Sequence, residues 1–156
     1  MTRKNFCIVS IIFLLFAGCG ERPNYTPTEM VEGVVTLDGV PVEGAEVTFY
    51  PTVSGIGESA MGKTDNKGHY RLSSMKGAPG KGTVAGEYGV TVSKWVTTKL
   101  DKPYIDKEQD ALIEFESKEL LPLVYTDIAY SPLRTSVVAG NNVIDLKLDS
   151  KAVRSR

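Results

Sequence analysis

Few side chains in this sequence have the chemistry of a catalyst, and the chain has a single histidine, His69. His69 alternates with the apolar Tyr70 and Leu72, so it lies on the opposite face of the strand that this alternation predicts. A surface histidine is therefore favoured over a general base. No serine lies in a G-x-S-x-G motif, where α/β-hydrolases place their nucleophile. We expect no catalytic residue and no enzyme activity.

The stretch 77–82, Gly-Ala-Pro-Gly-Lys-Gly, has the composition of a phosphate-binding loop without its spacing. Gly82 stands where Ser or Thr must follow the lysine, and Met75 stands where the first glycine must be. We expect a flexible turn inside a longer glycine-rich loop, 73–86, and no cofactor.

Two acidic segments offer oxygen atoms to a metal. Asp65-Asn66-Lys67-Gly68 lacks the spaced acids and the bidentate glutamate of a calcium loop, so a turn stabilised by its own Asp and Asn side chains is favoured. The second segment is more typical of a solvated face, and its acids are Asp106, Glu108, Asp110, Glu114, Glu116 and Glu119. We expect no metal site.

Cys19 follows a segment with the layout of a cleaved secretory signal. A basic start, Met1–Asn5, precedes the apolar stretch Phe6–Phe16 and two small residues. The apolar stretch is too short for a transmembrane helix, which needs roughly 20 residues. Residues 16–19 resemble the lipobox of bacterial lipoproteins, although Phe16 stands where the usual lipobox has Leu. The resemblance implies lipid attachment to Cys19, and plain secretion is the alternative.

The lipobox also implies where the protein resides. Gly20 follows the cysteine instead of Asp, which favours the outer membrane of the bacterial cell envelope, on its periplasmic or surface face. Cys7 leaves with the signal peptide, residues 1–18, so the mature chain has no thiol for a disulfide, a zinc site or catalysis. It keeps 16 basic and 19 acidic residues, a net charge of about −3. That balance argues against a nucleic-acid partner, which requires a concentrated basic face.

After a flexible tether at 19–29, short segments alternate apolar and polar residues. Residues 45–50 alternate in this way, and Val31, Val35 and Leu37 form a similar face before them. Asp38-Gly39 lies between the two segments and favours a hairpin. Residues 60–64 and 69–72 flank the turn 65–68 and predict a second hairpin.

The second half of the chain continues this pattern. Glu87–Trp95 alternates, and Leu133–Val138 and Val143–Leu148 predict a last pair around the turn 139–142. Seven short strands indicate an all-β, antiparallel β-sandwich over residues 30–148, followed by a tail at 149–156. The exception is 107–121, where Ala111, Leu112, Phe115 and Leu120 predict one short amphipathic helix in a loop insert.

Four segments resemble carboxypeptidase regulatory-like domains. Val31–Pro51 resembles their first hairpin, Thr64–Leu72 matches "T-D-x-x-G-x-Y-x-L", and Gly86–Val92 matches "G-x-Y-x-V-x-V". Leu121–Asn142 resembles the version found in small lipoproteins of planctomycete-type bacteria. The resemblance implies a transthyretin-like (prealbumin-like), seven-stranded Greek-key sandwich whose signature residues fix its shape. Transthyretin-like folds include hydroxyisourate hydrolases and intradiol dioxygenases, which use several histidines, so we expect neither activity here.

Aromatic residues in or near loops are candidates for contact with a partner, and they are Tyr25, Trp95, Tyr104, Tyr125 and Tyr130. The structural alternative is that Trp95 and Tyr125 cover the ends of the sandwich. We expect a lipid-anchored, non-catalytic envelope protein that serves structure or protein interaction through the glycine-rich loop and an insert at 96–132. The alternative is a lipoprotein that binds a small ligand or a glycan. The sequence identifies neither partner.

Overall fold

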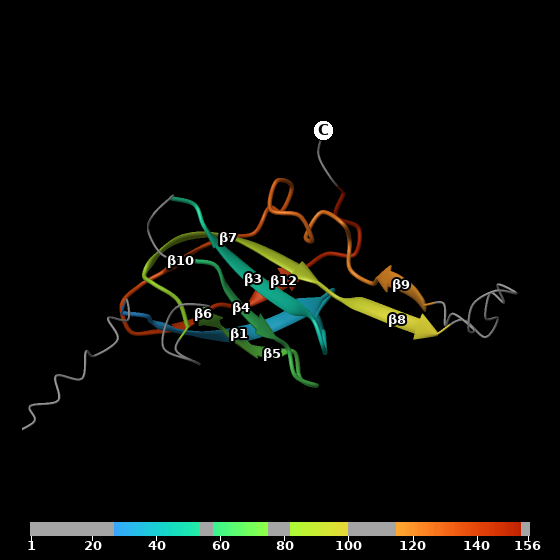
Figure 1. Ribbon diagram of the computed structural model, residues 1–156, viewed down its shortest axis with the longest axis horizontal. Coiled ribbons are helices and arrows are strands. Elements are labelled where there is room, and N and C mark those ends of the chain that lie inside the picture. Colours follow the sequence, from blue (N-terminus) through green and yellow to red (C-terminus); the bar gives the residue numbers. More distant parts are fainter. Residues whose placement is uncertain (1–26, 54–57, 75–81, 100–114, 154–156) are drawn as a thin grey trace, which may run out of the picture.

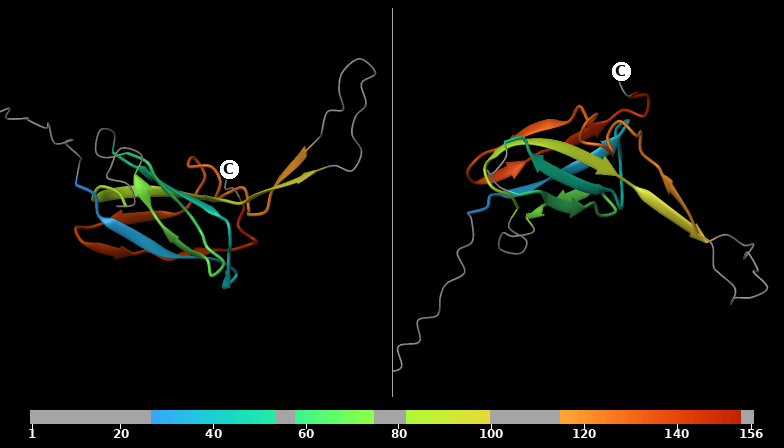
Figure 2. Two further views of the ribbon diagram at one scale, coloured as in Figure 1. Left: turned by 60° about the horizontal axis from the view of Figure 1, so that its bottom comes forward. Right: turned by 45° about the horizontal axis from the view of Figure 1, so that its top comes forward.

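The computed structural model describes residues 27–53, 58–74, 82–99 and 115–153, and every regular element within these ranges is a β-strand. Two sheets lie face to face, and a two-stranded ribbon projects beyond them (Figures 1 and 2). The prediction of an all-β, sandwich-like fold is confirmed at this level.

The first sheet, called the β1 sheet, is built around the strand β1. Its members are β1 (Met30–Leu37), β2 (Val40–Pro41), β5 (His69–Arg71), β11 (Asn141–Val143) and β12 (Leu146–Leu148). The strands β2 and β5 pair with β1 in antiparallel orientation, whereas β11 and β12 pair with it in parallel. The expectation of a purely antiparallel sandwich is therefore wrong on one side of β1.

The second sheet, called the β7 sheet, is antiparallel throughout in the order β10-β7-β3-β4-β6. Its members are β3 (Glu46–Pro51), β4 (Ala60–Lys63), β6 (Ser73–Ser74), β7 (Gly86–Ser93) and β10 (Arg134–Val137). The ribbon consists of β8 (Trp95–Lys99) and β9 (Phe115–Glu119). The described chain thus holds twelve strands, several of them very short, where the sequence predicted seven.

Two of the predicted hairpins do not form, because the two strands of each lie in different sheets. The first of them was predicted around Asp38-Gly39. Asp38 and Gly39 do form a turn with positive φ, 50° and 83°, but it joins β1 to the short β2. Thr64, the residue after β4, then fixes the segment 42–45 beside β4. Its Oγ1 donates to the Val42 carbonyl at 2.6 Å and accepts from the Ala45 N–H at 2.8 Å. As a result, β3 belongs to the β7 sheet.

The predicted last pair separates in the same way. Asn142 accepts a hydrogen bond from the Val138 N–H and donates one to the Val138 carbonyl, at 2.9 and 2.8 Å. Its side chain therefore closes the turn, and its backbone lies beside Val31 in the parallel pair of β1 and β11. The strand β10 pairs with β7 and lies in the other sheet.

The second predicted hairpin is confirmed at its turn, but the predicted pairing of 60–64 with 69–72 is wrong, because β4 pairs with β6 and residues 69–71 pair with β1. Near its base, β4 pairs with β6, with Ala60 beside Ser74. At its tip, the Asp65 N–H donates to the His69 carbonyl at 2.8 Å, and Gly68 has a φ of 77°. Between these ends β5 pairs with β1, so one continuous segment, 69–74, belongs to both sheets and joins them along one side.

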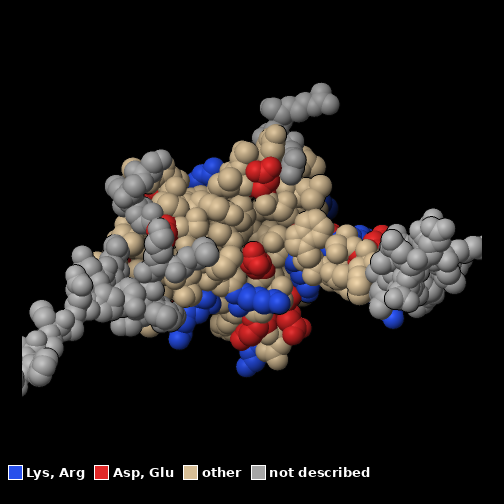
Figure 3. Space-filling view, viewed as in Figure 1, with Lys and Arg blue, Asp and Glu red and all other residues tan. Residues whose placement is uncertain are grey.

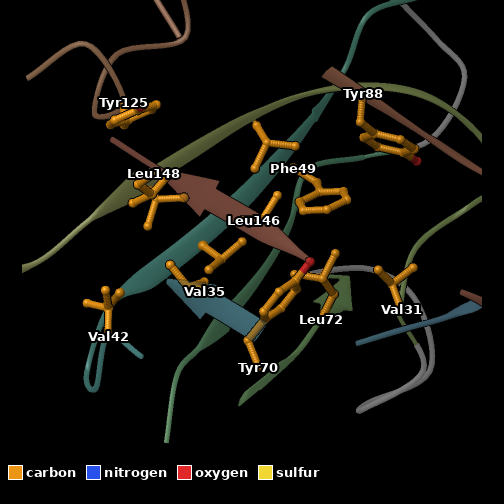
Figure 4. Packing of buried hydrophobic residues seen from close by; sticks show 14 of the residues in the cluster. Val31, Val35, Val42, Phe49, Tyr70, Leu72, Tyr88, Tyr125, Leu146 and Leu148 are labelled. Carbon is orange, nitrogen blue, oxygen red and sulfur yellow. The ribbon is translucent and has the colours of Figure 1, made fainter. Parts of the chain in front are cut away.

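The core lies between the sheets and follows the predicted alternation (Figure 4). Ala45, Val47 and Phe49 are fully buried, whereas Glu46 and Tyr50 are exposed. The remaining core side chains come from both sheets and from the segment after the ribbon, and they include Val31, Val35, Tyr70, Leu72, Tyr88, Val90, Val92, Leu121, Val124, Tyr125, Leu146 and Leu148. The alternation therefore identified the core side chains of these strands, but it is wrong in that Thr48 and Thr91, on the opposite faces of β3 and β7, are buried as well.

Tyr70 connects both sheets across this core (Figure 4). Its ring lies 6.4 Å from the ring of Phe49 in the β7 sheet, and its hydroxyl donates to the Ile144 carbonyl at 2.7 Å. That carbonyl lies over Gly33, where an added Cβ would be 1.9 Å from the Ile144 oxygen. A glycine at 33 is therefore required for the Ile144 carbonyl to lie where it accepts the hydrogen bond from the Tyr70 hydroxyl.

The helix predicted over 107–121 is wrong where the structure describes it. Residues 107–114 lie outside the described chain, and Phe115–Glu119 form β9. After the ribbon, the segment 120–133 runs along β7. The Val92 N–H donates to the Tyr125 carbonyl, and the Ser131 hydroxyl donates to the Val90 carbonyl. This segment closes the side of the sandwich next to β12.

We predict that Tyr70→Phe destabilises the protein by about 1–3 kcal/mol, because the partly buried Ile144 carbonyl loses its hydroxyl donor while the ring is kept. Urea unfolding followed by circular dichroism measures the change. Tyr50→Phe is the matched control, since Tyr50 is exposed on β3, and it should shift the free energy by no more than about 0.5 kcal/mol. Equal effects of both substitutions would contradict the role given to Tyr70.

Candidate functional site

The β8–β9 ribbon is the part of the described chain that stands clear of the sandwich (Figures 1 and 2). It arises because β7 continues into β8 with only Lys94 between them, whereas β3 pairs with this path no further than Ser93. β9 then returns antiparallel to β8, with Trp95 beside Glu119 and Lys99 beside Phe115. The ribbon is thus an extension of the β7 sheet by one of its central strands.

The foot of the ribbon is fixed by the carboxylate of Glu119. Its Oε1 accepts hydrogen bonds from the N–H groups of Lys94, at 2.7 Å, and Leu121, at 2.9 Å. The Leu120 N–H donates to the Lys94 carbonyl at 2.9 Å. Glu119 Oε2 is buried without a hydrogen-bond partner among the described residues. These bonds hold the start of β8 to the end of β9.

The ribbon exposes large apolar side chains. All five residues of β8 and four of the five in β9 are exposed, and Trp95 and Phe115 keep 61% and 59% of their surface in contact with solvent. Few charged side chains cover its start (Figure 3). An isolated two-stranded hairpin is at best marginally stable in water. Exposed aromatics on such an element are typical of a surface that binds another macromolecule.

An apolar cavity lies at the foot of the ribbon. It has a volume of about 530 Å³, and it is lined by Leu37, the segment 120–124, Ser150, Ala152 and Val153. Leu120, Leu123 and Val153 are exposed, so the cavity extends the apolar surface from the ribbon onto the body. This continuity makes the ribbon and its foot one candidate contact surface.

A second cavity of about 550 Å³ is polar and lies over β1 and β5. It is lined by His69, Asp65, Asp145 and the ion pair of Arg71 with Glu32, whose Nη2 and Oε2 atoms are 2.9 Å apart. His69 is exposed, as its place on the strand predicts. Asp145 is occupied by the Val34 N–H, which donates to its Oδ1 at 3.0 Å.

The residues of the T-D-x-x-G-x-Y-x-L motif all have structural tasks. Asp65 Oδ1 accepts hydrogen bonds from the N–H groups of Lys67 at 2.8 Å and His69 at 2.9 Å. These bonds lower the pKa of the Asp65 carboxyl below its ordinary value, that from Lys67 most. The geometry supports the self-stabilised turn over a calcium loop, and no group of three or more metal-binding side chains occurs in the ranges that the structure describes.

The structure separates the aromatic residues that the sequence proposed as one group. Trp95 is exposed on β8, and Tyr130 is half exposed after the ribbon. Tyr125 is buried, and its hydroxyl accepts from the Asp149 N–H at 3.0 Å, so it closes the sandwich as the structural alternative predicted. Neither cavity is lined by these three residues.

Other predicted residues lie outside the described chain. They are Cys19 with its leader, the tether up to residue 26, Tyr25, most of the glycine-rich stretch (77–81), Tyr104, and the acids Asp106, Glu108, Asp110 and Glu114. Of the acidic cluster, Glu116 is exposed on β9 and Glu119 fixes the foot of the ribbon. Among the residues that are described, no helix has the length and apolarity to span a membrane.

The sequence analysis identified an insert at 96–132 but did not predict that it contains the two-stranded ribbon. A strand signal was present, because Trp95-Val96-Thr97-Thr98 consists of residues that favour strands. Comparisons with protein-family models, curated proteins and solved structures find no match. The ribbon, the cavities and the sequence motifs are therefore the features that bear on function.

We predict that Asp65→Asn makes the protein less sensitive to acid. A carboxyl whose pKa is lowered by folding contributes stability above its unfolded pKa, about 4, and loses it as the pH falls through the folded pKa. Asparagine keeps an acceptor oxygen for the turn but does not titrate. The fall in Tm between pH 7 and pH 2.5 should be smaller for the variant.

The control is Glu43→Gln, which removes an exposed carboxyl on the neighbouring loop. It should leave the acid-induced fall in Tm close to that of the unchanged protein. If Asp65→Asn and the unchanged protein lost the same number of degrees on acidification, the two backbone hydrogen bonds would not stabilise the turn as argued.

Proposed function

We propose that this protein is a lipid-anchored, non-catalytic component of the bacterial cell envelope that acts through protein interaction. In this proposal, Cys19 carries the lipid and the tether ends before Glu29, since the predicted tether of 19–29 is wrong at Glu29, whose backbone pairs with Thr83. The sandwich is a rigid support, and the β8–β9 ribbon with its apolar foot is the contact surface. The outer membrane is the favoured location.

The observation that carries the proposal is the exposed ribbon. The sandwich buries Tyr70, Leu72 and Tyr88 and satisfies the Tyr70 and Tyr88 hydroxyls within the body. The ribbon, in contrast, leaves Trp95 and Phe115 in solvent on a scaffold fixed at its foot. Rigid aromatic side chains that stand clear of a body bind partners at a low cost in conformational entropy.

We also propose that the sandwich is a transthyretin-like, Greek-key domain of the carboxypeptidase regulatory-like type. The motif Thr64–Leu72 supports this. Its Thr holds the segment before β3, its Asp and Gly form the turn, and its Tyr and Leu pack in the core. Seven strands remain in the sandwich when the ribbon strands β8 and β9 and the two-residue β2 are left out, and β5 is joined with β6 and β11 with β12.

The alternative is an envelope lipoprotein that binds a small ligand or a glycan. The polar cavity beside His69 favours it, since paired charges and hydrogen-bonding groups meet there around about 550 Å³. Of the loop aromatics expected to stack on a sugar, Trp95, Tyr125 and Tyr130 are within the described residues, and none of these three lines that cavity. Thermal-shift screening against envelope glycans separates the two functions, because a ligand bound in the cavity raises Tm.

We predict that Cys19→Ala moves the protein from the membrane fraction to the soluble fraction, because two or more acyl chains provide the stable anchor. Fractionation of cells followed by immunoblotting measures this change. Cys7→Ala is the matched control, since it removes the other cysteine of the chain and should leave the protein with the membranes. Equal partitioning of the Cys19→Ala and unchanged proteins would refute lipid attachment at this residue.

We predict that the ribbon is required for capture of envelope proteins. The tagged protein retrieves its partners from a detergent extract of its own envelope, and mass spectrometry identifies them. Trp95→Ala combined with Phe115→Ala should lose them. Val143→Ala combined with Tyr50→Ala removes exposed apolar side chains from the sandwich and should retain them. Loss of the same proteins from both variants would place the contact surface elsewhere.

A further inference from the structure

Within the described residues, no strand pairs with the outer edge of β8. β3 begins at Glu46 beside Ser93 and leaves the path of β7 and β8 unpaired beyond that point. β9 covers the opposite edge, and no other described strand pairs with β8. Natural proteins protect such edges, because their unpaired N–H and C=O groups readily pair with another chain.

The hydrogen bonds at the foot show which backbone groups face outward. The Leu120 N–H donates to the Lys94 carbonyl, so these two residues form a hydrogen-bonded pair. Facing pairs of an antiparallel ladder alternate between bonded and non-bonded. The N–H and C=O groups of Val96 and Thr98 therefore face β9. Those of Trp95, Thr97 and Lys99 face outward.

The two edges of the ribbon differ in protection. β9 carries Glu116, Lys118 and Glu119 among its five residues, and such charges discourage pairing along its outer edge. β8 reads Trp-Val-Thr-Thr-Lys, with strong strand formers and a charge only at its end. The chemistry of the edges thus directs association to β8.

We propose that β8 pairs with β8 of a second copy of this chain, antiparallel about a two-fold axis at Thr97. In this register Thr97 faces Thr97 of the second copy, and Trp95 faces Lys99 of the second copy. These are the residues whose backbone groups point outward, so each facing pair exchanges two hydrogen bonds. The result is one four-stranded sheet in the order β9-β8-β8-β9.

Side chains favour the same register. Threonine opposite threonine is a favourable cross-strand pair, and the Lys99 ammonium comes within reach of the Trp95 ring. No pair of like charges faces across the axis. A two-fold contact closes on itself, and the charged β9 edges at the outside stop further addition of strands. The strand is therefore complementary to itself and selects a dimer.

The inference rests on the proposed function, because it names the partner of the same ribbon. The first test uses the full chain with Cys7→Ala and Cys19→Ala, so that an introduced thiol is the only one whatever the fate of the anchor. Directly facing residues of a bonded pair lie about 5.5 Å apart at Cα, within the rough range of 4.4–6.8 Å for disulfides. Thr97→Cys should cross-link to a dimer under mild oxidation on a non-reducing gel.

Thr98→Cys is the matched control for the cross-link. Its side chain points to the other face of the ribbon, and it faces Val96 of the second copy, so it should stay largely monomeric. Cross-linking of both thiols to the same extent, or of neither, would overturn the proposed register.

The second test measures association without a cross-link, by sedimentation velocity of the same cysteine-free full chain. Thr97→Lys places like charges opposite one another across the axis and should convert the dimer to monomer. Ser117→Lys, directly beside Thr97 on the same face of the ribbon but on β9, should keep the dimer. A monomeric parent chain at about 100 μM, or loss of the dimer with Ser117→Lys alone, would overturn the inference.

The outcomes also distinguish the two proposals. Envelope proteins that are captured through Trp95 and Phe115 while Thr97→Cys gives no dimer would leave the proposed function standing and refute self-pairing. A dimer that forms through Thr97 while the chain stays soluble with an intact Cys19 would support self-pairing and refute the anchor.

Discussion

The hydrogen bond from Tyr70 to the Ile144 carbonyl is the interaction on which the fold depends. Tyr70 comes from β5 on one side of β1, and Ile144 lies between β11 and β12 on the other side. Burial raises the pKa of the Tyr70 hydroxyl, and the charge of Asp145 raises it further, so the group remains a protonated donor. The C-terminal strands therefore reach their parallel places beside β1 only when Gly33 leaves room for the Ile144 oxygen.

The same aromatic side chain joins the two sheets. Tyr70 contacts Phe49, and Phe49 contacts Tyr88 at 5.8 Å between ring centroids. Tyr88 donates to the Val84 carbonyl at 2.7 Å, and its oxygen lies 3.0 Å from Thr83 Oγ1. Three rings thus cross the core, and both tyrosines of the set find polar partners at its periphery. Buried polar groups that are fully satisfied favour one arrangement of the strands over others.

Sequence reasoning identified buried faces and tight turns because both are local properties. Period-two alternation selected Val47 and Phe49, and Asp38-Gly39 adopted the positive φ that its residue types permit. It failed on partners, because the choice of a neighbouring strand depends on contacts far apart in the chain, such as Thr64 with Val42 and Asn142 with Met30. It failed on the ribbon because Ala111 and Leu112 precede Phe115 by four and three residues, which is the spacing of one helical face. Cys19 stays a prediction from sequence.

The ribbon and the body differ in how their strands are paired. In the body, the segment 69–74 switches from one sheet to the other and joins them, and the segment 120–133 is hydrogen-bonded to β7. The ribbon extends β7 beyond the last residue that β3 protects, and Glu119 fixes it by binding the backbone on both sides of the foot. An edge left open by chance would fray. Because the partly buried Glu119 carboxylate fixes the start of β8 against the end of β9, the opposite edge of β8 is a positioned surface, and no described strand pairs with its backbone groups.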